Sequence, residues 1–248
     1  QTMAVAYHIG RYFVFLIRVF AKPEKQRLYL KNILTEIWNL GIGSIGIVAI
    51  ISIFIGAVIT LQTAYNVTSP LFPLYLIGLG ARDSMILEFS STMVGLILAG
   101  KVGSSIAGEI GTMRVTEQID ALEIMGINPA SFLVMPKITA MLLISPALNV
   151  LSVFIGLFGG YLAVVATGVI PVNDFLYGLS LGFIPYYAIY SIVKSVFFSF
   201  LITSISAYQG YYAQGGSLEV GKASTRAVVY SSVMILVFNL ILTQLLLA

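Results

Sequence analysis

The sequence predicts an all-α integral membrane protein with five transmembrane helices, and three observations support this. Hydrophobic residues make up 58% of the 248 residues and charged residues only 9%, whereas a soluble domain carries roughly 25% charged residues. Five segments are long and apolar enough to cross a bilayer core of ~30 Å, which takes about 20 helical residues. Lys and Arg gather at alternate connections, as successive crossings of a membrane require. A soluble protein could not cover its surface with so few charges.

Residues 1–40 are expected to form interfacial and elbow helices rather than a sixth span. On a helical wheel, one narrow stripe of the first helix holds His8, Arg11, Arg18 and Lys22. The rest of its surface includes Tyr12, Phe13, Leu16, Ile17 and Phe20. Such a helix lies in the membrane surface, with its apolar face among acyl chains. The alternative is an ordinary helix packed on a partner. Pro23 is expected to end this helix and to open the next one, Glu24–Leu40.

Residues 41–248 form the predicted membrane domain. Glycines are frequent in its first three spans, and they allow helix backbones to approach closely in lipid. No inverted repeat of the kind found in many secondary transporters is visible. The predicted spans are Ile42–Thr63, Ser84–Ala107, Thr139–Thr167, Pro185–Tyr208 and Ala227–Leu247.

The distribution of basic residues predicts the orientation of the chain. With five spans, one side of the membrane receives Arg11, Arg18, Lys22, Lys25, Arg27, Lys31, Arg114, Lys137, Lys222 and Arg226. The opposite side receives only Arg82, which is followed by Asp83. We therefore expect a cytoplasmic N-terminus and a C-terminus on the far side.

The connection Glu109–Pro136 contains the most informative pattern. Its middle, Arg114–Met125, is expected to be a helix that ends at Gly126, with Pro129 beyond. Two faces are distinct. One face carries Glu117, Asp120 and Glu123, and the other carries Val115, Ile119, Leu122 and Met125. Because anionic lipid repels an acidic face, this pattern favours a protein partner. Packing on the protein's own bundle is the alternative.

Three charged residues fall inside predicted spans, where a charge is costly. Glu88 in span two and Lys194 in span four differ in predicted depth by ~8 Å, within reach of a long lysine side chain. We expect them to meet across a cavity, pairing with each other or with a lipid phosphate. A purely structural ion pair, or snorkelling to the interface, is the alternative. Lys101 lies nearer the cytoplasmic end of span two, where snorkelling or a structural pair is expected.

The composition also excludes several classes of function. The chain has no cysteine and one histidine, so thiolate and histidine metal sites are excluded. No GxxxxGK[ST] phosphate loop and no nucleophile–base arrangement is present, so neither ATP hydrolysis nor another catalytic activity is expected of this chain. The net charge of +3 is small, and the basic residues concentrate near the N-terminus, which suggests anionic lipid rather than nucleic acid.

Two sequence blocks resemble the MlaE/YrbE family of ABC-transporter permeases. The first comprises Leu98–Ser104 followed by Gly108–Gly126. The second comprises Gln209-Gly210, Gly215-Gly216 and Val220–Val229. Glu88 also stands where the family usually has a glutamate. The chain departs from the commoner pattern at three places, namely Lys101 for arginine, Leu87 for the arginine of some members, and Ser90-Ser91 for Gly-Pro.

The resemblance implies a permease subunit that moves phospholipids or related lipids between the inner membrane and the outer envelope of a bacterium. Two permease copies would pair with two cytoplasmic ATPase subunits, which bind ATP and Mg²⁺, and with an extracytoplasmic MCE-domain protein, usually a hexamer. The helix at about 114–126 would be the coupling helix that docks on the ATPase. The C-terminus would be periplasmic. The alternatives are a secondary transporter driven by an ion gradient and a non-transporting membrane scaffold.

Overall fold

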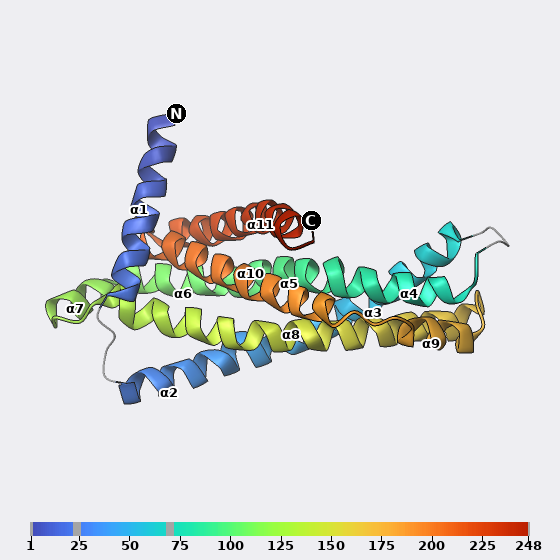
Figure 1. Cartoon of the computed structure of the whole chain (residues 1–248). Coiled ribbons are helices and arrows are strands. Elements are labelled where there is room, and N and C mark those ends of the chain that lie inside the picture. The colour runs from blue at the N-terminus through green and yellow to red at the C-terminus, as the bar shows by residue number, and fades with distance from the viewer. Residues whose placement is uncertain (1, 22–25, 68–71, 248) are drawn as a thin grey trace. The chain divides into compact units, whose positions relative to one another are not determined.

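The computed structural model describes residues 2–21, 26–67 and 72–247, which are helical almost throughout (Figure 1). No strand occurs in these residues. Each predicted span lies within one of five long apolar helical segments, so the all-α membrane fold and the five spans are confirmed. These segments are Tyr29–Asn66, Tyr75–Val115, Pro129–Thr167, Pro185–Tyr211 and Ser217–Leu247.

The chain divides into two compact units, each assembled from three separate stretches of sequence. Unit 1 comprises residues 1–43, 95–144 and 197–240, and unit 2 comprises residues 44–94, 145–196 and 241–248. The longest helices contribute residues to both units. Each unit therefore has its own packing and its own polar contacts, and they are described separately below.

The N-terminal region begins with α1 (Thr2–Phe20). The expected role of Pro23 lies outside the described residues. The elbow helix is α2 (Gln26–Glu36), which continues through a π-helical turn (Ile37–Gly41) and a short 3₁₀ turn into α3 (Ile45–Asn66). The elbow and the first span are thus one helical segment, not two elements separated at residue 40.

Span two is longer than predicted and is interrupted twice. It runs through α4 (Tyr75–Ser84), α5 (Ser90–Leu98) and α6 (Ser104–Val115). The π-helical turns Met85–Phe89 and Ala99–Gly103 join these pieces. Single π-turns inside α-helices are rare and frequent at functional sites. Here one turn carries Glu88 and the other carries Lys101.

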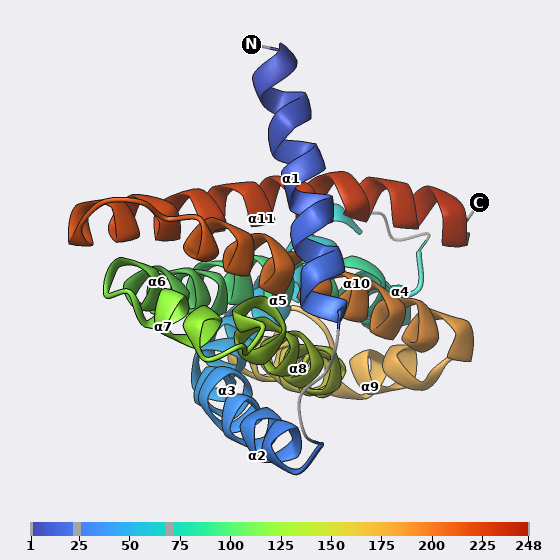
Figure 2. The same cartoon turned by 90° about the vertical axis from the view of Figure 1, so that its left-hand side faces the viewer.

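The connection after span two is more helical than predicted, but the separate helix within it is shorter than the predicted one. The predicted helix 114–126 is replaced by the end of α6 and by α7 (Gln118–Ile124), which lies beside α6 (Figure 2). The break falls at Glu117, whose φ of 59° is left-handed. Gly126 also has a positive φ, as expected for a helix stop. α8 (Pro129–Thr167) then begins ten residues before the predicted span.

In unit 2, sequence patterns missed α9 (Val172–Ser180), which lies against α4 (Figure 1). Glycine makes the close approach possible. A Cβ on Gly78 would overlap the carbonyl group of Phe175, and a Cβ on Gly178 would overlap that of Tyr75. The core beside this pair holds Ile59, Ile77, Ala81, Met85, Val164, Ile170 and Phe175.

Arg82, expected beyond the outer end of the second span, is buried within the protein. It lies in α4 with 3% of its surface exposed. Its guanidinium donates to the carbonyl oxygens of Leu179 and Leu181 at 2.9 and 2.7 Å and pairs with Asp83 at 2.9 Å. These carbonyls belong to the C-terminal end of α9 and the residue after it, where a cation satisfies groups that lack helical partners. Arg82 therefore fastens α9 to α4.

The last two helices are α10 (Pro185–Tyr211) and α11 (Ser217–Leu247). α11 starts ten residues earlier than predicted, so Lys222 and Arg226 lie in its first turns rather than in a loop. α10 buries many hydroxyl side chains, which act as polar contacts between membrane helices. They are Ser191, Ser195, Ser199, Thr203, Ser204 and Ser206.

Candidate functional site

Glu88 and Lys194 meet in unit 2, as predicted. The Lys194 ammonium lies 2.8 Å from a Glu88 carboxylate oxygen. Lys194 comes from α10, and Glu88 comes from the π-turn that precedes α5. Thr92, one turn later, donates to the other oxygen of Glu88 at 3.1 Å. The pair therefore joins the second and fourth spans within this unit.

The two partners of this pair are exposed to very different degrees. The Lys194 side chain is 0% exposed, whereas the Glu88 side chain is 39% exposed. Lys194 also donates to the Leu87 carbonyl at 3.3 Å and to the Tyr190 hydroxyl at 3.0 Å. An ammonium has three N–H donors, and all three are used here. Lys194 thus holds Glu88 in place, and Glu88 is the accessible half of the pair.

A hydroxyl and amide network joins the same two spans to the third span, and sequence reasoning missed it. Asn149 of α8 donates to the Ser191 hydroxyl at 2.7 Å. The Ser191 and Ser90 hydroxyls lie 3.3 Å apart. Ser90 is one of the positions at which the chain departs from the family pattern. Isolated Ser and Asn residues in apolar helices carry no spacing signal that would have predicted these contacts.

The predicted ATPase-coupling residues lie in or next to α7 in unit 1, with one buried anchor. Ile119 is 0% exposed, and Leu122 is partly buried. By contrast, Ile124 is 88% exposed and Met125 is 65% exposed. The predicted apolar face is therefore divided into a buried part, which includes Ile119, and an exposed part, which includes Met125. It also adds Ile124, which the two-face pattern did not include.

The three acids of this segment are not equivalent. Asp120 pairs with Arg114 at 2.5 Å, across the break between α6 and α7. Glu123 accepts a hydrogen bond from the Tyr211 hydroxyl of α10 at 3.3 Å. Glu117 is exposed and occupies the left-handed backbone position. Two of the acids thus fix α7 to its own unit while keeping part of their surface exposed.

Aromatic side chains hold α1 against the C-terminal part of α10 in unit 1. Phe15 is 0% exposed and packs against Tyr208, Tyr211 and Tyr212. The Tyr12 hydroxyl bonds Ser204 at 2.7 Å. Burial raises the pKa of the Tyr12 phenol, and the hydrogen bond with Ser204 offsets part of this rise. The prediction that Tyr12 faces acyl chains was therefore wrong.

Two further contacts tie α1 to this unit. The Arg11 guanidinium, expected at lipid headgroups, lies 3.7 Å from the ring centre of Tyr212. The Asn128 side chain, between α7 and α8, donates to the carbonyls of Arg18 and Ala21 at 2.8 and 3.2 Å. The exposed apolar residues Phe13, Ile17 and Phe20 remain suited to a membrane surface.

Buried Lys137 forms an ionic cluster that the sequence did not predict, with one partner, Glu109, that is 49% exposed. Its ammonium lies 2.6 Å from Glu36 and 2.8 Å from Glu109, which belong to α2 and α6. The lysine is 2% exposed, although we expected it in a loop. The cluster joins three helices of unit 1 and carries one excess negative charge. Separations of 28 and 101 residues hide such a cluster from sequence patterns.

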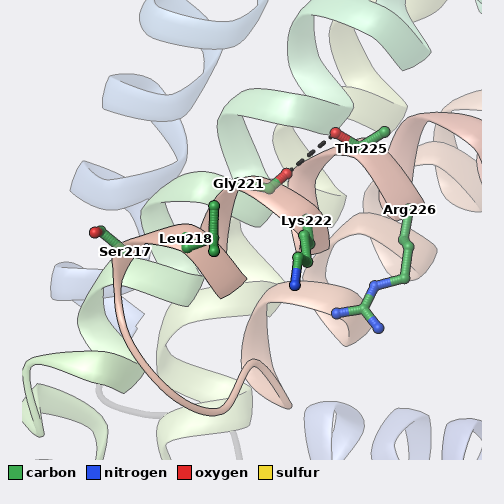
Figure 3. Close-up of a pocket in the computed structure, with 6 residues that line it drawn as sticks. All are labelled: Ser217, Leu218, Gly221, Lys222, Thr225 and Arg226. Atoms are coloured by element: carbon green, nitrogen blue, oxygen red, sulfur yellow. Dashed lines mark hydrogen bonds between the residues drawn. The ribbon is translucent and has the colours of Figure 1, made fainter.

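An open pocket of about 550 Å³ lies at the first turns of α11 in unit 1 (Figure 3). Its lining includes Lys222 and Arg226, whose side chains extend from the same side of the helix (Figure 3). Glu219 lies 2.6 Å from Lys222 and 4.0 Å from Arg226. The acid therefore neutralises part of this basic surface.

These features define a multi-pass membrane protein with an intramembrane ion pair and a short amphipathic helix between its second and third spans. Residues 33–245 match the model of the family described as Permease MlaE. The chain belongs to this family of ABC-transporter permeases.

Individual relatives agree with this assignment. The chain is similar to a "Probable ABC transporter permease protein" of Rickettsia bellii, with 36% identity over 99% of this chain and 94% of the relative. It is also similar to a probable ABC transporter permease of Synechocystis sp., with 33% identity over 92% of this chain and 86% of the relative. A third relative, "Protein TRIGALACTOSYLDIACYLGLYCEROL 1, chloroplastic" of Arabidopsis thaliana, is 28% identical over 92% of this chain and 65% of the relative.

Proposed function

We propose that this permease moves phospholipids or related lipids between the inner membrane and the outer envelope of a bacterium. It works as a homodimer with cytoplasmic ATPase subunits, which bind ATP and Mg²⁺, and with an extracytoplasmic MCE-domain protein. Membership of the MlaE family supports the permease role, and the lipid for which the Arabidopsis relative is named supports the substrate class. Basic residues are concentrated in the N-terminal region, in the connection between spans two and three, and in the connection between spans four and five. This distribution favours a cytoplasmic N-terminus and a periplasmic C-terminus.

The observation that carries the lipid assignment is the unequal burial of Glu88 and Lys194. A lipid needs an apolar path for its tails and a polar contact for its headgroup. The spans supply apolar surface, and Glu88 supplies a carboxylate that Lys194 holds in one orientation. An accessible charge inside a membrane span marks a substrate path more often than a structural brace. We assign the headgroup contact to Glu88 and its positioning to Lys194.

For energy coupling, we propose that α7 docks on the ATPase. Two large apolar side chains of this segment are exposed, Ile124 and Met125, and acidic Glu117 lies at the other end of the helix. An exposed apolar pair with acidic neighbours fits a partner groove that is apolar inside and basic at its rim. Ile119 and the Arg114–Asp120 pair keep the helix fixed while ATPase movements push it.

Purification of the complex tests this docking arrangement. Ile124→Asp should abolish copurification of the ATPase, because it places a charge at the apolar contact. Reversing Glu117, Asp120 and Glu123 to lysine should also weaken copurification and ATPase stimulation. Leu218→Asp, at a 73% exposed position at the start of α11, is the control for a new surface charge. Full ATPase recovery with Ile124→Asp would exclude α7 as the docking element.

Lipid transport is tested with the complex reconstituted into vesicles. Fluorescent phospholipid should move to acceptor vesicles or to the MCE partner only when ATP is hydrolysed. Transfer that follows an ion gradient without ATP would instead support a secondary transporter. A complex that hydrolyses ATP without moving any phospholipid would refute the lipid assignment.

A further inference from the structure

Lys101 differs from two buried lysines. It is the sole charged residue between Glu88 and Glu109, a stretch long enough to cross the bilayer core. The buried lysines, Lys137 and Lys194, both pair with carboxylates. In the residues that the structure describes, no carboxylate forms an ion pair with Lys101. Its charge therefore needs compensation from another source.

The immediate surroundings of Lys101 belong to unit 1 and leave room for a bound group. Its ammonium donates to the carbonyl oxygen of Gly43, which is a neutral acceptor. Lys101, Gly43 and Gly100 are all exposed. A Cβ built on Gly100 meets nothing within 4 Å, and one on Gly43 only just reaches the Trp38 carbonyl at 3.9 Å. The ammonium thus lies at an open, glycine-lined surface rather than in a packed core.

The π-turn around Lys101 is itself stabilised. The Ser104 hydroxyl donates to the carbonyls of Gly100 and Lys101 at 2.5 and 3.1 Å. These bonds satisfy backbone groups that a π-turn displaces from the regular α-helical pattern. The irregular backbone is therefore maintained beside the lysine, and such turns are frequent at functional sites.

The Lys101 side chain does not reach toward the charged end of its own helix. Glu109, the next charged residue along the span, is eight residues away, a rise of about 12 Å. Side chains on a helix lean toward its N-terminus, and this direction points Lys101 away from Glu109. The contact with Gly43, at the start of the first predicted span, holds the ammonium close to the cytoplasmic interface, where phospholipid phosphates lie.

We propose that Lys101 binds the phosphate group of a membrane phospholipid, at a second site separate from Glu88 and Lys194. The phosphate supplies the missing negative charge, and the glycine surface accommodates the headgroup. This proposal does not depend on which substrate the permease moves, because any phospholipid of the surrounding membrane carries the required group. Lys101 offers one of its N–H groups to Gly43 and has two more for phosphate oxygens.

Native mass spectrometry of the purified full-length permease tests the proposal. The protein is stripped of loosely held lipid, and the tightly bound phospholipid is counted for the wild type and three variants. Lys101→Gln should retain one phospholipid fewer per chain, and Lys101→Arg should retain the wild-type number. Lys222→Gln removes an exposed lysine at the start of α11 and should also retain the wild-type number.

Two results would overturn the proposal. Equal phospholipid retention by the wild type and Lys101→Gln would mean that the lysine binds no lipid. A second arm incubates stripped wild-type protein with inorganic phosphate. A phosphate adduct that Lys101→Gln lacks, without any difference in lipid, would assign the site to free phosphate instead. Bound lipid is counted without ATP, so this outcome is independent of the ATP-driven transfer that tests the proposed function.

Discussion

Lys137 and Lys101 belong to the same compact unit, yet the protein compensates their charges in opposite ways. Lys137 is buried and meets two carboxylates from two other helices. Lys101 is exposed and, among the described residues, bonds to a backbone carbonyl rather than to a carboxylate. A lysine whose charge is neutralised by carboxylates can have a purely structural role. A lysine inside a span without such a partner either binds a ligand of opposite charge or destabilises the protein.

Lys194 in unit 2 stands between these cases. It is as buried as Lys137, but it has one carboxylate partner rather than two. The comparison therefore predicts different outcomes when each lysine is removed. Loss of Lys137 should affect stability most, loss of Lys194 should affect both stability and transport, and loss of Lys101 should affect bound lipid.

The largest effect is expected for Lys137→Met. This change leaves two carboxylates facing each other without a cation. Glu109 is 49% exposed, but Glu36 is only 17% exposed, and removal of the cation from such a mostly buried pair costs about 3 kcal/mol. The free energy of unfolding, measured by denaturant titration in detergent, should fall by that amount. The triple variant with Glu36→Gln and Glu109→Gln restores neutrality and should recover most of the loss. If Lys137→Met alone is as stable as the wild type, the cluster does not stabilise the fold.

A smaller loss of stability is expected for Lys194→Met. Glu88 is 39% exposed, so water can solvate part of the orphaned carboxylate, and the cost is about 1–2 kcal/mol. The double variant with Glu88→Gln removes the unpaired charge and should regain stability. Lipid transfer should remain lost in the double variant, because the accessible carboxylate is gone. Restored transfer in the double variant would make the pair purely structural.

The smallest change in stability is expected for Lys101→Gln. An exposed lysine that bonds to a single carbonyl should alter the free energy of unfolding by no more than about 0.5 kcal/mol. Thermal unfolding of matched wild-type and variant samples measures this directly. A loss as large as that of Lys137→Met would mean that Lys101 is a structural residue, and the contrast between the two lysines would disappear.

The sequence predicted the parts of the fold that depend on local pattern. Long apolar runs identified all five spans, because a membrane helix must satisfy its backbone internally and present apolar side chains. Helix ends were missed when polar residues continue a helix beyond the apolar run, as at Glu109 and Lys222. α9 was missed because nine residues are too few to form a span and its packing against α4 is a tertiary contact.

Prediction of the candidate site succeeded and failed for similar reasons. The meeting of Glu88 with Lys194 followed from depth along two spans, since a costly buried charge needs a partner. The cluster at Lys137 was missed because its carboxylates belong to two other helices, 28 and 101 residues away in the sequence. The exposure of Ile124 and Met125 was missed because the helix starts at Gln118, after a left-handed Glu117, rather than at Arg114.

Phospholipid transfer by a reconstituted Glu88→Gln complex tests the central claim most directly. This change keeps the size of the side chain and removes the accessible charge. The proposed lipid path predicts that ATP-driven transfer is lost while the ATPase still copurifies and the protein remains folded. Transfer at the wild-type rate by this variant would contradict the assignment of Glu88 to the lipid path.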